Sequence, residues 1–219
     1  MMNRSFVYRN GLSITFITLF LIAWAAQTFF GWHTFVQELQ DEGQPGISFF
    51  AYLHTGHFIS ATFENFQSEF LQMALYVVLT IFLRQIGSAE SKSLDKKEEV
   101  DREPQAKDGA PKPVFQGGWR LFLYKHSLSI AFVVLFLVTW YFHLVGSLRD
   151  YNFQNKLKGK PTESISSYLG EPQFWFETFQ NWQSEFLSVA SIVLLTIFLR
   201  QKGSPESKPV DSPHLETGK

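Results

Sequence analysis

The chain has 219 residues, a formal net charge of −1 at pH 7 and no cysteine, which excludes disulfides and thiol chemistry. It also has no basic stripe of the kind that binds nucleic acid, so we expect no nucleic-acid partner. The charges are segregated: no Lys or Arg occurs between Arg9 and Arg84, whereas thirteen charged residues lie between Glu90 and Lys112. Soluble domains intersperse their charges, so a long cation-free block rich in Phe and Leu predicts a membrane protein.

The first hydrophobic segment, Leu12 to Gly31, is uncharged and long enough to cross a hydrocarbon core of roughly 30 Å at about 1.5 Å per residue. We therefore expect a transmembrane helix. The alternative is a cleaved secretory signal, with Arg4 and Arg9 as its basic region and Ala23-Trp24-Ala25 as its cleavage motif. We favour a retained helix because hydrophobic residues continue beyond Ala25 and an equivalent segment recurs in mid-chain.

The next segment is predicted to be an external loop with structure of its own. A polar turn, Asp41 to Gly46, leads into the apolar run Ile47 to Leu53. Ser48 is a suitable N-cap for a short helix that lies in the membrane interface and ends near Gly56.

A second hydrophobic segment follows, but it is shorter. Phe70 to Leu83 contains fourteen uncharged residues, and extending it back to Phe63 includes Glu69. We predict that it spans the membrane, because the first helix would otherwise lack a hairpin partner. Arg84 ends the segment abruptly, as an interfacial anchor does.

The linker from Ser93 to Gly118 mixes Lys, Asp and Glu with three prolines, so we expect it to be disordered. Its opposite charges nearly cancel, which argues against a polybasic lipid-binding segment.

The second half of the chain repeats the first at an ungapped offset of 116 residues. Phe63 to Leu71 recurs as Phe179 to Leu187 with two substitutions, and Leu79 to Gln85 recurs unchanged as Leu195 to Gln201. The offset predicts a second copy of each element. These are the spans Ser127 to Gly146 and Phe186 to Leu199, and a loop helix at Ile165 to Leu169 capped by Ser164, with Pro172 in the first turn of the last long helix.

These elements predict an all-α membrane protein with four transmembrane helices, arranged as two parallel-repeat helical hairpins with short interfacial helices in the external loops. The expected segments are a first two-helix repeat (1–92), a disordered cytoplasmic linker (93–118), a second repeat (119–202) and a disordered cytoplasmic tail (203–219). The N-terminus, linker and tail together carry fifteen of the nineteen basic residues, so the positive-inside rule places them in the cytoplasm.

One polar face is the candidate functional site. Polar residues recur at helical spacing on the second long helix of each copy. The candidates are Asn65, Glu69, Gln72, Tyr76 and Thr80, with Asn181, Glu185, Ser188 and Thr196 in the second copy. The functional interpretation is a polar path in which Glu69 and Glu185 bind protons or cations. The structural interpretation is an interhelical hydrogen-bond seam. We favour the latter, because about 22 Å of helix separates Glu69 from Arg84, which leaves Glu69 near the outer interface.

No residues predict catalysis or a cofactor. His54, His57 and Glu64 could suggest an external metal site, but the second copy has Gly170, Gln173 and Gln180 in their places, and no further ligand completes a coordination shell. There is no phosphate-binding glycine loop and no nucleophile elbow. We therefore expect neither an enzyme nor a bound metal.

Three motifs carry a resemblance to a known family. Gly56-His57-Phe58, the run Phe63 to Gln72, and Gly87-Ser88-Ala89-Glu90-Ser91-Lys92 resemble an uncharacterised family of small bacterial integral membrane proteins, a domain of unknown function, here in two tandem copies. The second copy departs from the pattern at Pro172-Gln173-Phe174. The resemblance implies a location in the bacterial inner membrane and brings no activity or ligand.

We therefore expect a non-enzymatic interaction or accessory component of that membrane. Its partners would be the lipid bilayer and either further copies of itself or another membrane protein. The alternative is a small oligomeric transporter or channel that uses Glu69 and Glu185.

Overall fold

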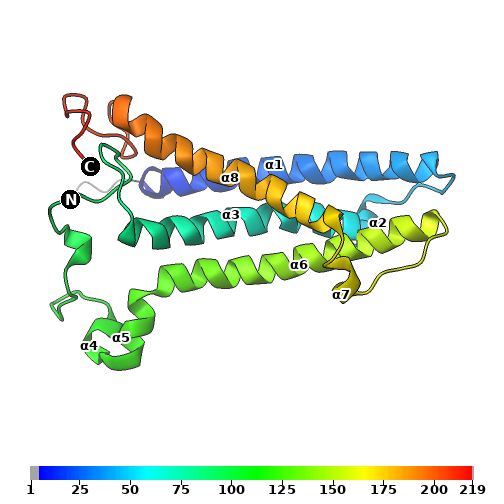
Figure 1. Ribbon diagram of the computed structural model, residues 1–219, viewed down its shortest axis with the longest axis horizontal. Helices are drawn as coiled ribbons and strands as arrows, with labels where there is room; N and C mark the ends of the chain where they lie inside the picture. Colours follow the sequence, from blue (N-terminus) through cyan, green and yellow to red (C-terminus); the bar gives the residue numbers. More distant parts are fainter. Residues whose placement is uncertain (1–4, 219) are drawn as a thin grey trace. The chain divides into compact units, whose positions relative to one another are not determined.

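The computed structural model describes residues 5–218, which are helical with connecting loops and contain no strand. Arg4, part of the signal-peptide alternative, and Lys219, the end of the expected tail, lie outside the described residues. The predicted all-α class is confirmed for the described part. In chain order the elements are α1 (Phe6–Asp41), α2 (Phe49–Tyr52), α3 (Gly56–Phe82), the 3-10 helix η1 (Glu99–Asp101), α4 (Lys112–Gln116), α5 (Gly118–Lys125), α6 (Ser127–Leu157), α7 (Ile165–Tyr168) and α8 (Pro172–Phe198) (Figure 1).

The bounds of several elements recur at the 116-residue offset. α2 corresponds to α7, and α3 corresponds to α8, which begins at Pro172 as expected. The predicted N-caps are confirmed: the hydroxyl of Ser48 accepts the Ala51 N–H, and that of Ser164 accepts the Ser167 N–H. The short helices end at Tyr52 and Tyr168, a few residues before the expected positions.

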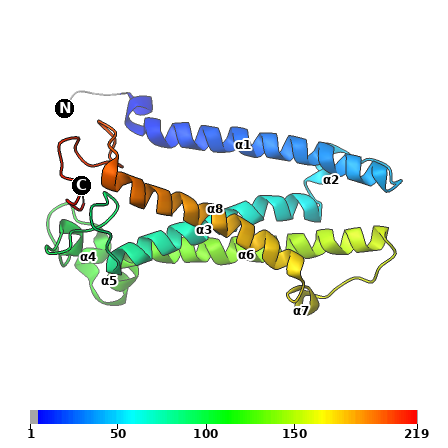
Figure 2. The ribbon, with the colours of Figure 1, turned by 45° about the horizontal axis from the view of Figure 1, so that its top comes forward.

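The long first helix of each copy is interrupted near its start. In α1 the break is at Asn10, whose φ of −122° and ψ of 15° are not helical, and Figure 2 shows the first turns set at an angle to the rest of the helix. In the second copy the break falls at the equivalent residue, His126, with φ −111° and ψ 7°, which separates α5 from α6. Neither residue is proline or glycine.

The contacts within the chain divide it into two compact units. Unit 1 contains the described residues up to Glu64 together with Trp140–Phe174, and unit 2 contains Asn65–Thr139 together with the described residues from Trp175 onward. The helices α3, α6 and α8 each contribute residues to both units. The expected division at residues 92, 118 and 202 follows the sequence repeat, and it remains a prediction.

In unit 1 the two short helices each bury one tyrosine. Tyr52 of α2 packs with Phe35 and Leu39, and Tyr168 of α7 packs with Leu144 and Phe174. The hydroxyl of Tyr168 hydrogen-bonds to that of Ser147 at 2.5 Å. In the first copy the residue equivalent to Ser147 is Gly31, where an added Cβ would lie 2.5 Å from the Tyr52 hydroxyl. The two copies therefore accommodate the equivalent tyrosine hydroxyl with different residues.

α3 and α6 approach each other closely in unit 1. A Cβ at Gly56 would lie 2.4 Å from the backbone nitrogen of Asp150, and one at Gly146 would lie 2.6 Å from that of Ser60. Both obstacles are backbone atoms, which cannot rotate away as a side chain can. Small residues at such a crossing let helices meet backbone to backbone, as is common in membrane proteins.

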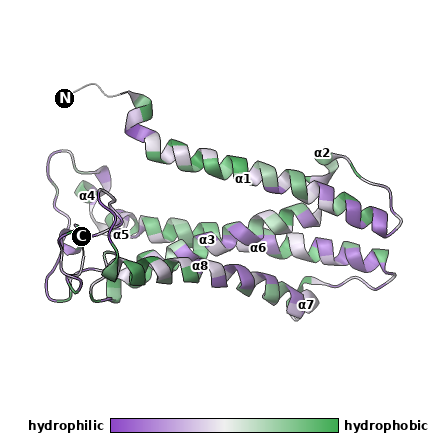
Figure 3. Cartoon of the chain, turned by 90° about the horizontal axis from the view of Figure 1, so that it is seen from above, coloured by the Kyte–Doolittle hydropathy of each residue, from purple (hydrophilic) through white to green (hydrophobic). Residues whose placement is uncertain are grey.

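Within residues 5–218, three helices are long and apolar enough to cross a membrane, judged by length and composition: α1, α6 and α8. Hydrophobic residues run along the middle of α1, and its C-terminal end is hydrophilic (Figure 3). Most of the large apolar side chains on α1 are exposed, among them Phe16, Leu19 and Phe30. α3, which we expected to span, is not among the three, because its first half carries His57, Glu64, Gln67 and Glu69.

We predict that Gly146→Ala destabilises the protein by about 1–3 kcal/mol, because the new methyl group overpacks a backbone contact. The measurement is the thermal unfolding midpoint of the detergent-solubilised protein. Gly11→Ala is the matched control, because a Cβ there meets nothing within 4 Å. A Gly146→Ala protein as stable as the control would show that the close approach of α3 and α6 is not maintained in solution.

Candidate functional site

In unit 2 the two candidate glutamates come together. The side chains of Glu69 of α3 and Glu185 of α8 are neighbours. Glu69 is exposed and Glu185 is half-buried. The structure therefore brings two of the candidate residues, one from each copy, to the same place.

The remaining polar residues of the candidate face mostly bond to nearby backbone. Thr80 Oγ1 donates to the carbonyl of Tyr76 at 2.8 Å, and Ser188 Oγ donates to that of Glu185 at 2.8 Å. Asn181 Nδ2 donates to the carbonyl of Glu177 at 3.0 Å. Such bonds hold a hydroxyl or amide against its own helix instead of linking it to the next side chain along the face. Asn65 is exposed, and Gln72 lines an open groove described below.

Tyr76 and Thr196 connect the face to a loop that follows α3. The hydroxyl of Tyr76 donates to the carboxylate of Glu90. Thr196 Oγ1 is buried, hydrogen-bonds to the hydroxyl of Ser88 at 3.2 Å and accepts the N–H of Ala89 at 3.2 Å. Ser88, Ala89 and Glu90 belong to the motif that the sequence singled out.

That motif ends a helix in the same way in both copies. The serine hydroxyls of Ser91 and Ser207 accept the backbone N–H groups of Gln85 and Gln201, at 3.0 and 2.9 Å. The glycines at 87 and 203 have φ of 81° and 86°, a left-handed conformation that glycine adopts without strain. We therefore interpret the motif as a helix-terminating loop.

An arginine completes each helix end. Arg84 Nη1 donates to the carbonyls of Thr80, Ile81 and Leu83, and Arg200 Nη1 donates to those of Thr196, Ile197 and Leu199. The last carbonyls of a helix lack partners within it, and a cation there is also favoured by the helix dipole. The arginines thus cap the helices, in agreement with their expected position at the ends of the hydrophobic segments.

The final lysine of the motif differs between the copies. Lys92 pairs with Asp101 at 2.5 Å, and this contact holds the pKa of the Asp101 carboxyl below its usual value. Lys208 is buried, and its Nζ donates to the carbonyls of Pro213, His214 and Glu216. Burial lowers the pKa of Lys208. Each lysine therefore fastens its loop to the segment that follows it.

The polar contact that the sequence did not reveal is on another face of α3. Gln67 is fully buried, and its Oε1 accepts the indole N–H of Trp182 at 2.9 Å. Ser60, Gln67 and Ala74 are all buried and are spaced by seven residues, which corresponds to two turns of one helix face. This spacing is the signal that could have identified the buried side of α3.

The histidines of the rejected metal site have local partners in unit 1. His57 Nδ1 lies 3.0 Å from the hydroxyl of Tyr52, and His54 Nδ1 lies 2.9 Å from the carbonyl oxygen of Phe50. Burial lowers the pKa of His57, and the charge of Glu38 opposes this shift. Burial, followed by the charges of Asp150 and Glu38, raises the pKa of Tyr52 to about 12. Both groups are thus held neutral, so the tyrosine hydroxyl can donate to an unprotonated Nδ1.

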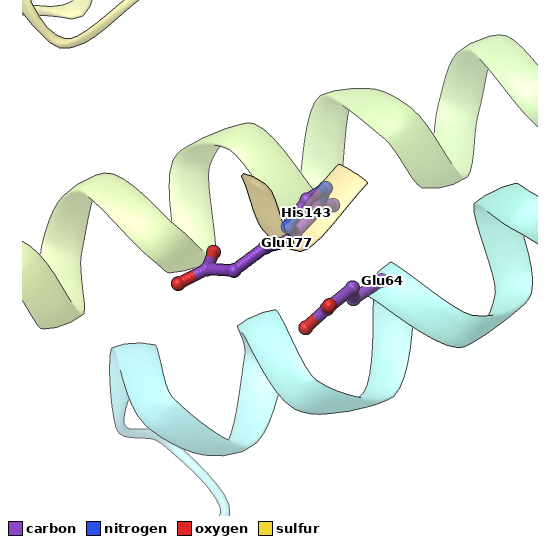
Figure 4. A group of neighbouring side chains, drawn as sticks. All are labelled: Glu64, His143 and Glu177. Carbon is purple, nitrogen blue, oxygen red and sulfur yellow. The ribbon is translucent and has the colours of Figure 1, made fainter. Parts of the chain in front are cut away.

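Another histidine in unit 1 lies beside a carboxylate. His143 of α6 is fully buried and stacks on Phe174, with ring centroids 5.2 Å apart. A ring nitrogen of His143 lies within 4.8 Å of a carboxylate oxygen of Glu64, which projects from α3 (Figure 4). Glu177, also labelled in Figure 4, belongs to α8 in unit 2. Imidazole and carboxylate are metal-ligand types, and unit 1 supplies two of them, whereas a protein zinc site uses three or four.

The fold and these contacts define a helical protein, and three of its described helices are candidates to cross a membrane. The chain belongs to the family described as "Domain of unknown function (DUF6766)", whose model matches residues 3–219. Searches of the curated proteins and of the solved structures gave no match.

We predict that acidification destabilises unit 1 through His57. Because its folded pKa is below its unfolded value, the unfolded chain binds a proton more readily; stability is fully present above about pH 6.5 and falls as the pH decreases below it. The measurement is the unfolding midpoint in detergent between pH 8 and pH 5. His57→Gln introduces the residue found at the equivalent position, Gln173, and should make the decrease shallower. Identical pH profiles for the two proteins would contradict this assignment.

Proposed function

We propose that this chain is an integral membrane protein of the bacterial inner membrane, built from two tandem repeats that each cross the bilayer twice. Its N-terminus, linker and tail are cytoplasmic. The segregation of basic residues supports this orientation, and the recurrence of helix bounds at the 116-residue offset supports the tandem repeat. The family and the three apolar helices are compatible with it.

α3 is proposed as the fourth crossing. It has 27 residues, the same as α8, and is about 40 Å long at about 1.5 Å per residue. This length exceeds a hydrocarbon core of roughly 30 Å, so the polar first turns can lie outside the core while the apolar second half lies within it. The arginine at its end supports an interfacial boundary there.

The proposed role is that of a non-enzymatic interaction or accessory component. The observation that carries it is the exposure of α1, in which only 6% of the apolar window is buried within the chain. Such a surface is stable only against lipid or against other helices. The proposed partners of this surface are the lipid bilayer and either a further copy of this chain or another membrane protein.

The topology is tested by single-cysteine labelling of intact cells, which is straightforward because the chain has no cysteine. Cysteines at Gln44 and Lys158 should react with a membrane-impermeant reagent, whereas one at Ala106 should react only after the membrane is opened. External labelling at Ala106 would eliminate the proposed orientation. If α3 does not cross, Gln44 and Ala106 will be labelled from the same side.

A second function is favoured by one observation, the proximity of the carboxyl groups of Glu69 and Glu185. Two neighbouring carboxyl groups can bind a proton or a cation, and ionisable groups within membrane segments are commonly functional. The second proposal is accordingly a small oligomeric transporter or channel.

The double variant Glu69→Gln with Glu185→Gln distinguishes the two proposals. The amides retain hydrogen bonding without charge, so under the leading proposal we expect normal membrane insertion and an unfolding free energy within about 1 kcal/mol of wild type. The accompanying measurement is proton and cation flux into proteoliposomes, with Glu42→Gln, an exposed position, as the control. Flux that wild type and Glu42→Gln share and the double variant lacks would establish the transporter instead.

A further inference from the structure

Unit 2 contains an open apolar groove between α3 and α8. Its cavity volume is about 370 Å³, within the range typical of small-ligand sites. Leu75, Leu79 and Leu83 of α3 form one wall, and Phe186, Val189 and Val193 of α8 form the other. These walls are apolar, and the hydroxyls of Tyr76 and Thr80, which also line the groove, donate to other groups of the chain. A hydrocarbon chain is therefore the ligand type that the walls suit.

The charged groups of the groove lie at the C-terminal end of α3, where Arg84, Gln85, Glu90 and Ser91 line it. Gln72, Tyr76 and Thr80 are uncharged polar residues that line it further along α3. Arg84 uses Nη1 to cap its helix, and among residues 5–218 no hydrogen-bond acceptor is assigned to its Nε or Nη2. Arg84 is exposed, so these donors are accessible to a ligand in the groove.

In the second copy, the equivalent nitrogens belong to Arg200, and acceptors within the protein satisfy them. Arg200, equivalent to Arg84, donates from Nε to the carbonyl of Pro209 at 3.2 Å and from Nη2 to that of Ser212 at 3.1 Å. The C-terminal tail thus satisfies the two nitrogens of Arg200 that do not cap α8. No corresponding backbone carbonyls are assigned to Arg84 in the described part of the chain, although the two arginines cap their helices identically.

Two acidic groups lie near Arg84. Asp101 is influenced by the charge of Arg84 but forms its ion pair with Lys92. Glu90 lines the same end of the groove, and its carboxylate accepts the hydroxyl of Tyr76, a neutral donor that leaves its negative charge in place. Among the lining residues, the guanidinium of Arg84 is the cation that can offer donors to a ligand.

We propose that the groove binds one acyl chain of an anionic phospholipid, with the lipid phosphate held by Arg84 Nε and Nη2. This inference rests on the membrane placement proposed above. A planar guanidinium recognises phosphate through two parallel hydrogen bonds. Basic pockets between membrane helices on the cytoplasmic side bind lipid headgroups, and the proposed topology puts Arg84 at that boundary. The groove holds the acyl chain of the lipid, and Arg84 binds the phosphate of its headgroup.

The test measures lipid retention by the full-length protein in mild detergent with native mass spectrometry. Phosphatidylglycerol and phosphatidylcholine with the same acyl chains are the probes. Wild type should retain one phosphatidylglycerol in preference to phosphatidylcholine. Arg84→Gln should weaken phosphatidylglycerol binding by about tenfold or more, as expected for the loss of a charge-assisted hydrogen-bond pair. Arg200→Gln is the matched control and should bind as wild type does.

Three further measurements separate the alternatives. Arg84→Lys keeps the positive charge but lacks the planar guanidinium that donates two parallel hydrogen bonds. It should therefore bind phosphatidylglycerol more weakly than wild type and more tightly than Arg84→Gln. Leu79→Trp should fill the groove and reduce retention of both lipids. Glycerol phosphate, which has the headgroup chemistry without an acyl chain, should not displace the bound lipid; displacement would mean that a free phosphate is the ligand and would overturn the proposal.

Equal loss of phosphatidylglycerol in Arg84→Gln and Arg200→Gln would also overturn it, because the effect would then be one of general charge. So would crosslinking of Leu79 to a second copy with no lipid retained. Circular dichroism establishes that each variant is folded; if Arg84→Gln is not, Leu79→Trp and Arg84→Lys decide the matter. A correctly inserted protein that retains no preferred lipid would reject the lipid site and leave the proposed membrane role intact.

Discussion

The last carbonyl groups of a helix have no partners within the helix, so they need hydrogen-bond donors from elsewhere. In both copies an arginine supplies these donors from one nitrogen, and a serine of the following loop accepts the next N–H. Because the chain then turns through a left-handed glycine, the loop returns toward its own helix. The positions of Lys92, Glu90 and the polar end of the groove all follow from this capping arrangement.

The differences between the copies are concentrated in single contacts around a shared scaffold. Gly31 admits the Tyr52 hydroxyl, whereas Ser147 hydrogen-bonds to that of Tyr168. His57 partners Tyr52, but the equivalent residue in the second copy is Gln173. The bounds of α2 and α3 and the serine cap of α2 recur in α7 and α8. A duplicated chain can keep local signals in both halves while tertiary partners diverge, because caps depend on nearby sequence and packing contacts do not.

This distinction explains what the sequence could predict. Ser48, Ser164 and Pro172 act within a few residues of their own helix ends, so their roles could be inferred without knowledge of the fold. The partnership of Gln67 with Trp182 could not, because it joins residues 115 positions apart. The exposure of the candidate face could not be predicted from the sequence either. Helical spacing groups Asn65 with Glu69 on one face, but only packing determines which face is buried.

The two charged features of unit 2 differ in how their charge can be compensated. A carboxyl group such as that of Glu69 or Glu185 has a neutral, protonated form. An arginine has no such form, because its guanidinium remains protonated in proteins. The remaining donors of Arg200 bond to backbone carbonyls of the C-terminal tail. These carbonyls are neutral dipoles, so they stabilise the charge of Arg200 without neutralising it. Arg84 has no neutral form, and no carbonyl of the described chain accepts from its Nε or Nη2. An anionic lipid would provide both the acceptors and the opposite charge.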